Sequence, residues 1–153
     1  MTGEKPEILL LSGPNLNLLG EREPDIYGSA KLEDLVAAAD TEATRFGLAV
    51  RHLQSNHEGD LVEAIHAARQ SAAGVIINAG AFTHYSWAIH DALASFDAPV
   101  VELHISNPAA RDDFRHLSVV APVATAVIAG LGAAGYPMAV RAMAELLGRD
   151  PAH

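Results

Sequence analysis

Two side chains in this sequence could act as a base and an acid. Arg22 lies shortly before Tyr27, and a nearby guanidinium favours the charged form of a phenol, so Tyr27 could remove a proton. Glu102 lies two positions before His104 in an otherwise apolar stretch. A carboxylate at that spacing on a strand lies on the same side and could hold one ring nitrogen while the other donates a proton. These residues predict proton-transfer chemistry.

Each candidate also has a purely structural explanation. Arg22 lies between two glutamates and could form a solvated ion pair. Tyr27 could be a packed aromatic with its hydroxyl in water. His104 could be held by the backbone, although a buried Glu102 would then be unexplained. His84 could either orient a ligand or cap the helix that follows it.

The elements that must position these residues are five strands alternating with helices. Apolar or alternating runs predict strands, and apolar residues at helical spacing predict helices. Short connections indicate a parallel sheet with helices on both faces. We expect an α/β fold, a flavodoxin-like three-layer sandwich with a five-stranded parallel sheet of order 2-1-3-4-5. The predicted strands are 8–11, 48–54, 74–78, 99–105 and 117–121, and the predicted helices are 31–46, 60–70, 85–96 and an Ala-rich region over 123–147.

Polar residues gather where these predicted strands end. Ligands of open parallel sheets bind outside the carboxyl ends of the strands, and the connections at the opposite edge carry no comparable cluster. The sequence therefore predicts one pocket for a small anion, suited to proton transfer on a carboxylate substrate. Its candidate residues follow the first, third and fourth strands: Asn15, Arg22, Tyr27, Asn78, His84, His104, Ser106, Arg111 and Arg115.

Composition excludes several other classes of function. The 153 residues predict a single domain over 1–153, with flexible ends at 1–6 and 149–153. The net charge of -9 and the lack of basic clusters argue against a nucleic-acid partner. No stretch suits a signal peptide or a membrane span, so we expect a cytoplasmic protein without membrane association.

No metal or cofactor is expected. There are no cysteines, the histidines lack the spacing of a zinc pair, and no glycine-rich nucleotide motif is present. Lys5 and Lys31 are the only lysines, and neither lies where a desolvated amine is expected, so imine chemistry is disfavoured.

Several blocks of the sequence resemble type II 3-dehydroquinate dehydratases. They occur in order between about Ile8 and Val140, so the resemblance covers most of the chain and is specific. The blocks include Gly13-Pro14-Asn15-Leu16-Asn17-Leu18-Leu19-Gly20, Arg22-Glu23-Pro24, Ile26-Tyr27-Gly28, Gln54-Ser55-Asn56-His57-Glu58-Gly59, Thr83-His84 and Val101-Glu102-Leu103-His104-Ile105-Ser106-Asn107.

This resemblance implies a trans elimination of water from 3-dehydroquinate, giving 3-dehydroshikimate through an enolate without Schiff base or metal. Tyr27 would be the base, and Arg22 would stabilise its phenolate and close a lid. His104 would be the acid, oriented by Glu102, and Asn15 would help to stabilise the enolate. The reaction would serve the shikimate pathway or quinate catabolism, a choice that the sequence leaves open.

The resemblance also implies a set of residues that bind the substrate. It further implies that the chain forms a homo-oligomer. Asp91 would reach the site of a neighbouring subunit in a dodecamer built from trimers. Arg111 would be a supporting charge near the lid. Ser12, Ala79 and Phe82 depart from the usual residues of this family, and Phe82 removes a hydroxyl near the expected pocket. The remaining substrate-binding residues would be Asn78, His84, Ile105, Ser106 and Arg115.

Two functions of other classes compete with this reading. A catalytically silent binding module could have kept the anion pocket, and a flavodoxin-like electron carrier could share the fold. Turnover would exclude the first, and a colourless purified protein would exclude the second.

Overall fold

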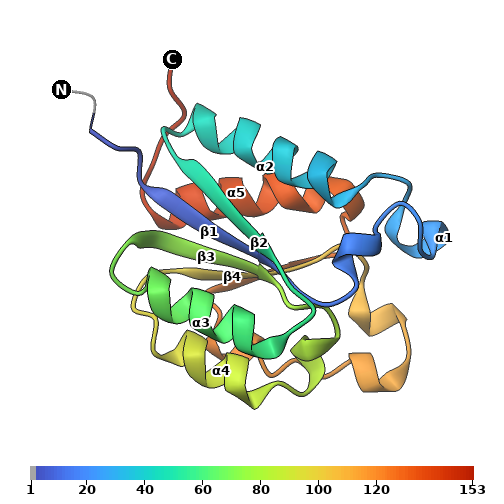
Figure 1. The fold of residues 1–153 in the computed structure, drawn as a ribbon. Helices are drawn as coiled ribbons and strands as arrows, with labels where there is room; N and C mark the ends of the chain where they lie inside the picture. Colours follow the sequence, from blue (N-terminus) through green and yellow to red (C-terminus); the bar gives the residue numbers. More distant parts are fainter. Residues whose placement is uncertain (1–2) are drawn as a thin grey trace.

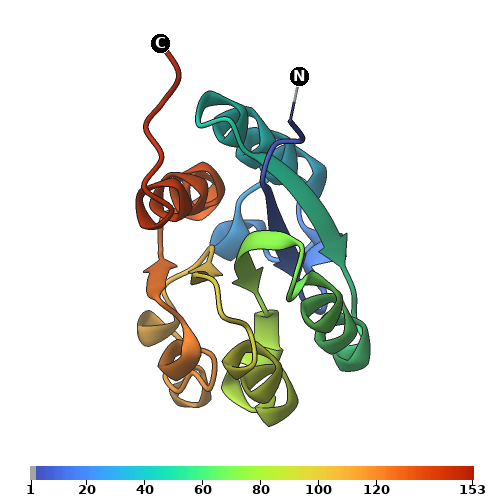
Figure 2. The same cartoon turned by 90° about the vertical axis from the view of Figure 1, so that its left-hand side faces the viewer.

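The computed structural model describes residues 3–153 and confirms the predicted α/β architecture (Figure 1). Five parallel strands form one sheet in the order β2-β1-β3-β4-β5. Helices cover both faces, with α2 and α5 on one side and α3 and α4 on the other (Figure 2). The strands are β1 (Glu7–Ser12), β2 (Ala49–Gln54), β3 (Ala72–Asn78), β4 (Val100–His104) and β5 (Ala126–Ala129). The helices are α1 (Pro24–Tyr27), α2 (Leu32–Arg45), α3 (Glu58–Ala68), α4 (Trp87–Ala94) and α5 (Gly135–Leu146).

The central strand β1 explains why its sequence is a continuous apolar run. Ile8 and Leu10 pack into the core beneath α2 and α5, whereas Leu9 and Leu11 pack into the core beneath α3 and α4. A strand covered on both faces has no solvent side, so it needs no polar alternation. This buried strand fixes the position from which the loop after Ser12 departs.

The prediction of a strand over 117–121 is wrong, because this segment forms a turn. The Ser118 hydroxyl accepts hydrogen bonds from the backbone N–H groups of Val120 and Ala121 at 3.1 and 2.9 Å. Val119 donates its N–H to the Thr83 carbonyl at 2.8 Å rather than to a strand. Val119 and Val120 are buried, so the apolar run does belong to the core. The hydrogen bonds of its backbone, however, are made within the turn and to Thr83 instead of to a neighbouring strand.

The fifth strand, β5, lies instead inside the region predicted to be helical. It pairs in parallel with Val101–His104 of β4. Its sequence is Ala-Val-Ile-Ala with alternate residues exposed. Alanine favours helices in isolation, but pairing with a neighbouring strand overrides that weak preference. Within the same predicted region, Gly135 begins α5, where Pro137 falls in the first turn and displaces no helical hydrogen bond.

The segment before β1 and the C-terminal segment lie at the same end of the molecule, opposite α1 (Figure 1). In the predicted flexible segment 149–153, Ala152 donates its N–H to the Arg45 carbonyl at 2.7 Å. Met1 and Thr2, which belong to the other predicted flexible end, lie outside the described residues. Within residues 3–153, no helix is long and apolar enough to cross a membrane.

Candidate active site

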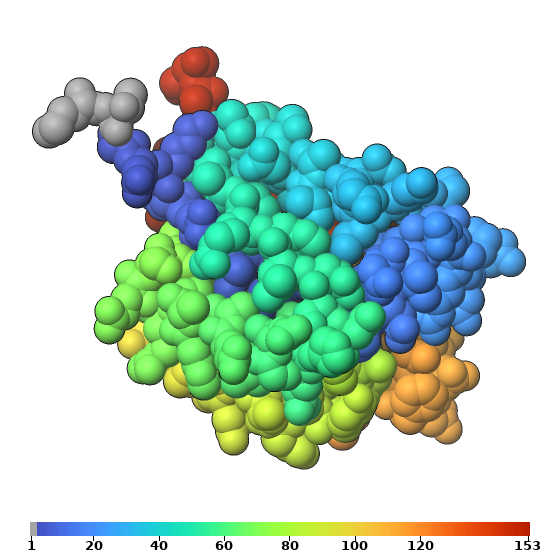
Figure 3. Space-filling view, viewed as in Figure 1, coloured from blue at the N-terminus to red at the C-terminus, as the bar shows by residue number. Residues whose placement is uncertain are grey.

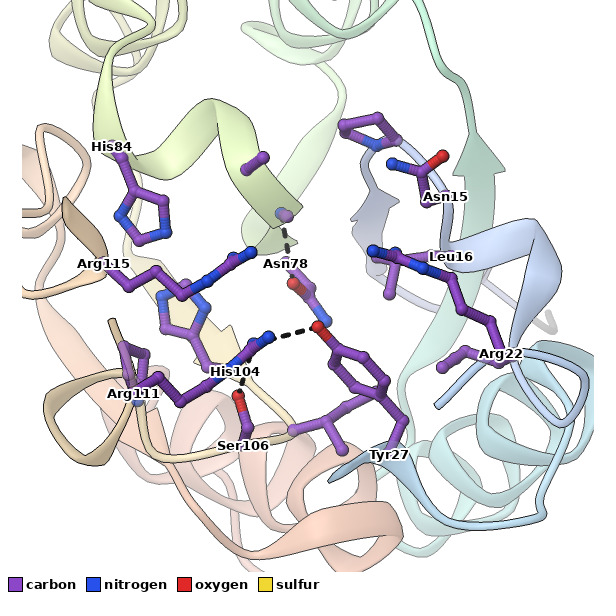
Figure 4. A pocket seen from close by; sticks show the side chains of 16 residues that line it. Asn15, Leu16, Arg22, Tyr27, Asn78, His84, His104, Ser106, Arg111 and Arg115 are labelled. Carbon is purple, nitrogen blue, oxygen red and sulfur yellow. Dashed lines mark hydrogen bonds between the residues drawn. The ribbon is translucent and has the colours of Figure 1, made fainter. Parts of the chain in front are cut away.

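A pocket opens at the carboxyl ends of β1, β3 and β4, where the sequence predicts it (Figure 4). Figure 3 shows the segment around α1 directly beside the segment that follows β4, at one end of the molecule. Every predicted site residue except Glu102 and Asp91 lines this pocket. The lining residues are Pro14, Asn15, Leu16, Leu19, Arg22, Tyr27, Asn78, Gly80, Ala81, His84, His104, Ile105, Ser106, Pro108, Arg111 and Arg115.

One wall of the pocket is a short exposed lid over residues 20–28. Gly20 and Gly28 bound it with φ values of 88° and 80°, a conformation that glycine adopts without strain. Glu23 also has a positive φ, 43°, which is unfavourable for a side chain of this size. Glu23 is followed by the single turn of α1, and Pro24 suits the first position of that turn. Tyr27 is the last residue of α1.

The Tyr27 hydroxyl accepts a hydrogen bond from the guanidinium of Arg111, whereas the sequence points to Arg22 as the cation beside it. Nη1 of Arg111 donates to the Tyr27 oxygen at 2.9 Å and lies 3.3 Å from the Ser106 oxygen (Figure 4). The guanidinium carbon of Arg111 is 5.4 Å from the centre of the Tyr27 ring. A cation in this position stabilises a phenolate. Arg111 therefore contacts the lid directly, at the Tyr27 oxygen.

Arg22 lines the pocket from the lid, yet its closest charged partner is on the lid itself. Its Nη2 lies 3.6 Å from a carboxylate oxygen of Glu23, and both side chains are partly exposed. The solvated ion pair that the sequence allowed for Arg22 is thus present in this conformation. An exposed pair of this kind is weak, so it does not prevent Arg22 from binding an anion in the pocket.

The opposite wall of the pocket is buried and contains the predicted acid. His104 ends β4, and its Nε2 lies 3.6 Å from a carboxylate oxygen of Glu102. That separation suits an ion pair but is too long for a direct hydrogen bond. The Glu102 side chain is 2 % exposed, so it lies behind His104 rather than in the pocket. Ser118 donates its hydroxyl hydrogen to the same oxygen of Glu102.

Ser118 is a site residue that the sequence reasoning missed. Its hydroxyl both donates to Glu102 and accepts from the turn at Val120 and Ala121. A single serine inside a presumed strand carries no distinguishing signal. Only the correct placement of the turn brings it against β4.

The polar residues of the remaining wall are held in defined orientations. Asn15 has a left-handed backbone, with φ of 67°, and donates its N–H to the Asn56 side chain at 2.9 Å. Nδ1 of His84 lies 2.7 Å from the Leu117 carbonyl oxygen, which can only accept, so Nδ1 carries a proton and Nε2 has no partner in the described part of the chain. The alternative role of His84 as a helix cap is wrong, because Ser86 caps α4 by accepting the Ile89 N–H at 3.1 Å.

Three arginines make the pocket attractive to an anion. Arg22, Arg111 and Arg115 all line it, with no aspartate or glutamate among the lining residues. Nε of Arg115 is buried without a hydrogen bond in the described part of the chain; the Asp112 carboxylate oxygen lies 3.7 Å from it. A guanidinium is well matched to a carboxylate in geometry and charge. Within residues 3–153, no three histidine, aspartate or glutamate side chains lie close enough together to hold a metal.

Two predicted residues lie away from the pocket surface for different reasons. Glu102 lies behind the wall, as described. Asp91 lies on α4, is exposed, and is not among the residues that line the pocket of its own chain. Phe82, which was expected near the pocket, does not line it and instead packs edge-on against Tyr85, with ring centres 5.9 Å apart.

Comparisons with known proteins agree with this geometry. The family model of class II dehydroquinases matches residues 6–144. A 3-dehydroquinate dehydratase of Corynebacterium glutamicum is 55% identical over 140 residues, which is 92% of this chain and 97% of the relative. A catabolic 3-dehydroquinase of Pyricularia oryzae is 56% identical over 149 residues, or 96% of this chain and 95% of the relative.

Solved structures give the same result. A type II dehydroquinase from Propionibacterium acnes superposes with a TM-score of 0.89 at 44% identity, covering 94% of this chain and 99% of that one. The type II dehydroquinase from Butyrivibrio crossotus has a TM-score of 0.88, also at 44% identity, covering 92% and 99%. The chain therefore belongs to the class II dehydroquinase family, and it is an enzyme, a hydro-lyase of the 3-dehydroquinate dehydratase type.

Proposed function

We propose that the chain converts 3-dehydroquinate to 3-dehydroshikimate by a stepwise trans elimination through an enolate. The Tyr27 phenolate removes the proton at C2, and the electrons of that C–H bond form the enolate. The enolate then collapses to the ketone and a C1–C2 double bond while the C1–O bond breaks. His104 protonates the departing hydroxyl, which leaves as water. The neighbouring ketone acidifies the C2 proton, so a positioned base and a donor to the enolate suffice.

The observation that carries this proposal is the hydrogen bond from Arg111 to the Tyr27 oxygen at 2.9 Å, across the pocket mouth. A cation bonded to the phenol oxygen stabilises the phenolate that the first step requires. His104 lines the same pocket from β4, with Glu102 behind it. The Glu102 carboxylate, 3.6 Å from Nε2 of His104, helps to orient the ring for proton donation in the second step.

Arg22 has a related role in the proposal. It stabilises the phenolate and helps to close the lid, exchanging its exposed partner Glu23 for the negative charge in the pocket. Asn15, held at the rigid start of the loop, assists the enolate. Both residues line the pocket already.

The substrate carboxylate and hydroxyls have a matching set of partners. The unbonded Nε of Arg115 offers a donor to the carboxylate. The backbone N–H groups of Ile105 and Ser106, together with Asn78 and the free Nε2 of His84, supply further donors and an acceptor. Arg111 completes the positive lining of the pocket.

We extend the proposal to a homo-oligomer in which Asp91 approaches a neighbouring pocket. Asp91 lies one helical turn after Trp87 on α4, and residues at this spacing share a face. Trp87 is 62% exposed and the nearby Tyr85 59%. Exposed aromatic side chains of this size are typical of protein interfaces. A dodecamer built from trimers is the expected assembly, and light scattering measures it.

The reaction needs neither metal nor Schiff base in this proposal. Lys5 and Lys31, the two lysines of the chain, are both absent from the residues that line the pocket. Borohydride added with substrate should therefore leave the activity intact, because there is no imine to reduce. Turnover should also persist in the presence of a chelator.

The biological route has two candidates. The name of the Pyricularia oryzae relative favours quinate breakdown, whereas the shikimate pathway uses the same reaction. Deletion of the gene distinguishes them: loss of growth on quinate supports the first, and a requirement for aromatic amino acids supports the second. Either route is compatible with the cytoplasmic location that we propose.

The direct test is the ultraviolet absorbance of the conjugated enone formed from 3-dehydroquinate by the purified protein. We expect turnover with chelator present. Absence of turnover, combined with thermal stabilisation by the substrate, would instead support a silent binding module.

A further inference from the structure

A row of buried polar side chains runs from the pocket wall into the face of the sheet beneath α2 and α5. Ser12 ends β1 and is the register partner of Asn78, which ends β3. His52 lies on β2, the other neighbour of β1. Because alternate residues of a strand share a face, all three point to the side where Tyr136 of α5 is buried. Ser12, Asn78 and Tyr136 are 0, 4 and 1 % exposed.

The contacts along this row are continuous. The Asn78 oxygen accepts the Gly80 N–H at 3.2 Å, and its nitrogen donates to the Tyr136 hydroxyl at 3.4 Å. The Ser12 side chain hydrogen-bonds the Tyr136 hydroxyl as well. The Ser12 hydroxyl oxygen lies 2.9 Å from Nε2 of His52.

Chemistry fixes one donor and one acceptor in this row. An amide nitrogen can only donate, so the Tyr136 oxygen accepts from Asn78. The Ser12 hydroxyl and Nε2 of His52 share one hydrogen bond, whose direction depends on the tautomer of the ring. Burial lowers the pKa of His52, which favours its neutral ring.

The row constrains the direction in which Asn78 faces. A flipped amide would put its nitrogen against the Gly80 N–H, so two donors would meet. In the observed orientation, one amide hydrogen is bonded to Tyr136 and the second is free. Asn78 lines the pocket, so it can offer that second hydrogen to an oxygen of a ligand.

We propose that Tyr136 is a positioning residue for substrate binding, which holds the Asn78 amide so that it presents an N–H donor to the substrate. Ser12 supports it through the side-chain hydrogen bond between the two hydroxyls. This inference rests on the proposed contact between Asn78 and the substrate. It predicts that Tyr136 acts on binding only through Asn78, whereas a residue that merely fills the core would act independently of it.

A double-mutant cycle on kcat and KM tests the inference. Tyr136→Phe removes only the hydroxyl, and we expect KM to rise about tenfold, the effect of one lost hydrogen bond, with kcat changed less than about twofold. In the Asn78→Ala background, Tyr136→Phe should produce no further change in KM. Val140→Ala is the matched control, because Val140 is buried one turn later on the same helix. It should lower the melting temperature and leave KM unchanged.

Ser12→Ala is the second variant and provides the test if Tyr136→Phe does not fold. It removes the side-chain hydrogen bond between Ser12 and Tyr136, and we expect KM to rise about threefold, again only when Asn78 is present. An unchanged KM in these hydroxyl-deletion variants, or an effect that persists without Asn78, overturns the inference.

The same cycle separates this inference from the proposed function. If Asn78→Ala alone leaves KM at the wild-type value, the proposed contact with the substrate is wrong, and the inference is wrong with it. If Asn78→Ala raises KM and Tyr136→Phe does not, only the positioning role of Tyr136 is wrong.

Discussion

The two walls of the pocket differ in how the chain holds them. The lid wall, with Arg22 and Tyr27, is mostly exposed and is bounded by glycines with positive φ. The strand wall, with Glu102 and His104, belongs to β4, every residue of which is buried. Side chains packed in a core keep one conformation, whereas an exposed single turn has little to hold it. The proposed base is therefore on the adaptable wall, and the proposed acid is on the rigid one.

This difference separates catalysis from stability. Substitutions on the lid should change the rate and leave the free energy of unfolding almost unaltered. Substitutions behind the strand wall should lower both. The predictions below test that contrast.

Tyr27→Phe should give the largest loss of activity, about a thousandfold or more in kcat, because the proposed base is removed. Its melting temperature should stay close to that of the wild type, since Tyr27 is only half-buried on the lid. The enone assay and thermal unfolding measure the two quantities. A near-native rate would exclude Tyr27 as the base.

Arg111→Ala and Arg22→Ala compare two cations near the same phenol. Arg111 donates directly to the Tyr27 oxygen, so its loss should lower kcat about a hundredfold or more. The loss of Arg22 should also remove most activity if the lid brings it to the phenolate during turnover. If Arg22→Ala keeps a nearly native rate while Arg111→Ala does not, the ion pair with Glu23 is the main contact of Arg22 throughout the reaction. Arg141→Ala, on the exposed side of α5, is the control for the loss of a cation.

Glu102→Gln should lower activity about tenfold to a hundredfold and also destabilise the fold. The substitution keeps the shape of the side chain but removes the charge that faces His104. The neutral amide would also have to accept the Ser118 hydrogen in place of the carboxylate. Disturbing a buried hydrogen bond to a charged group costs about 2 kcal/mol. The free energy of unfolding, measured with denaturant, and kcat should therefore both decrease, whereas Tyr27→Phe should lower only kcat. An unchanged stability would contradict the rigid-wall description.

The smallest expected effect concerns pH and His52, on the edge strand β2. Burial lowers the pKa of His52 below its ordinary value of 6.5, so the unfolded chain binds a proton more readily than the folded one. Above pH 6.5 the His52 ring is neutral in both states and has no effect on the free energy of unfolding. As the pH falls through 6.5 towards the lowered pKa, the unfolded chain takes up a proton first, so stability is lost. His52→Asn should reduce the loss of melting temperature between pH 7.5 and 5.5, whereas His153→Asn, at the exposed end of the chain, should not. Equal pH dependence in all three proteins would contradict this assignment.

The fold and most of the pocket lining were predictable because their signals are local. Apolar β1, the helical spacing of α2 and the polar residues after each strand all follow from neighbours in sequence. The position of β5 was not predictable in this way. Its alanines favour a helix locally, and only pairing with β4 makes them a strand.

The sequence by itself determined the parallel α/β sheet and the edge at which its polar residues collect. The tertiary structure decided which of those residues meet. Arg111 rather than Arg22 bonds Tyr27, Ser118 supports Glu102, and Tyr136 supports Asn78. Each pair joins elements that are distant in sequence or separated by a turn, and their contacts depend on loop geometry and register. No local spacing encodes them, because hydrogen bonds of this kind form only once the strands and helices have packed.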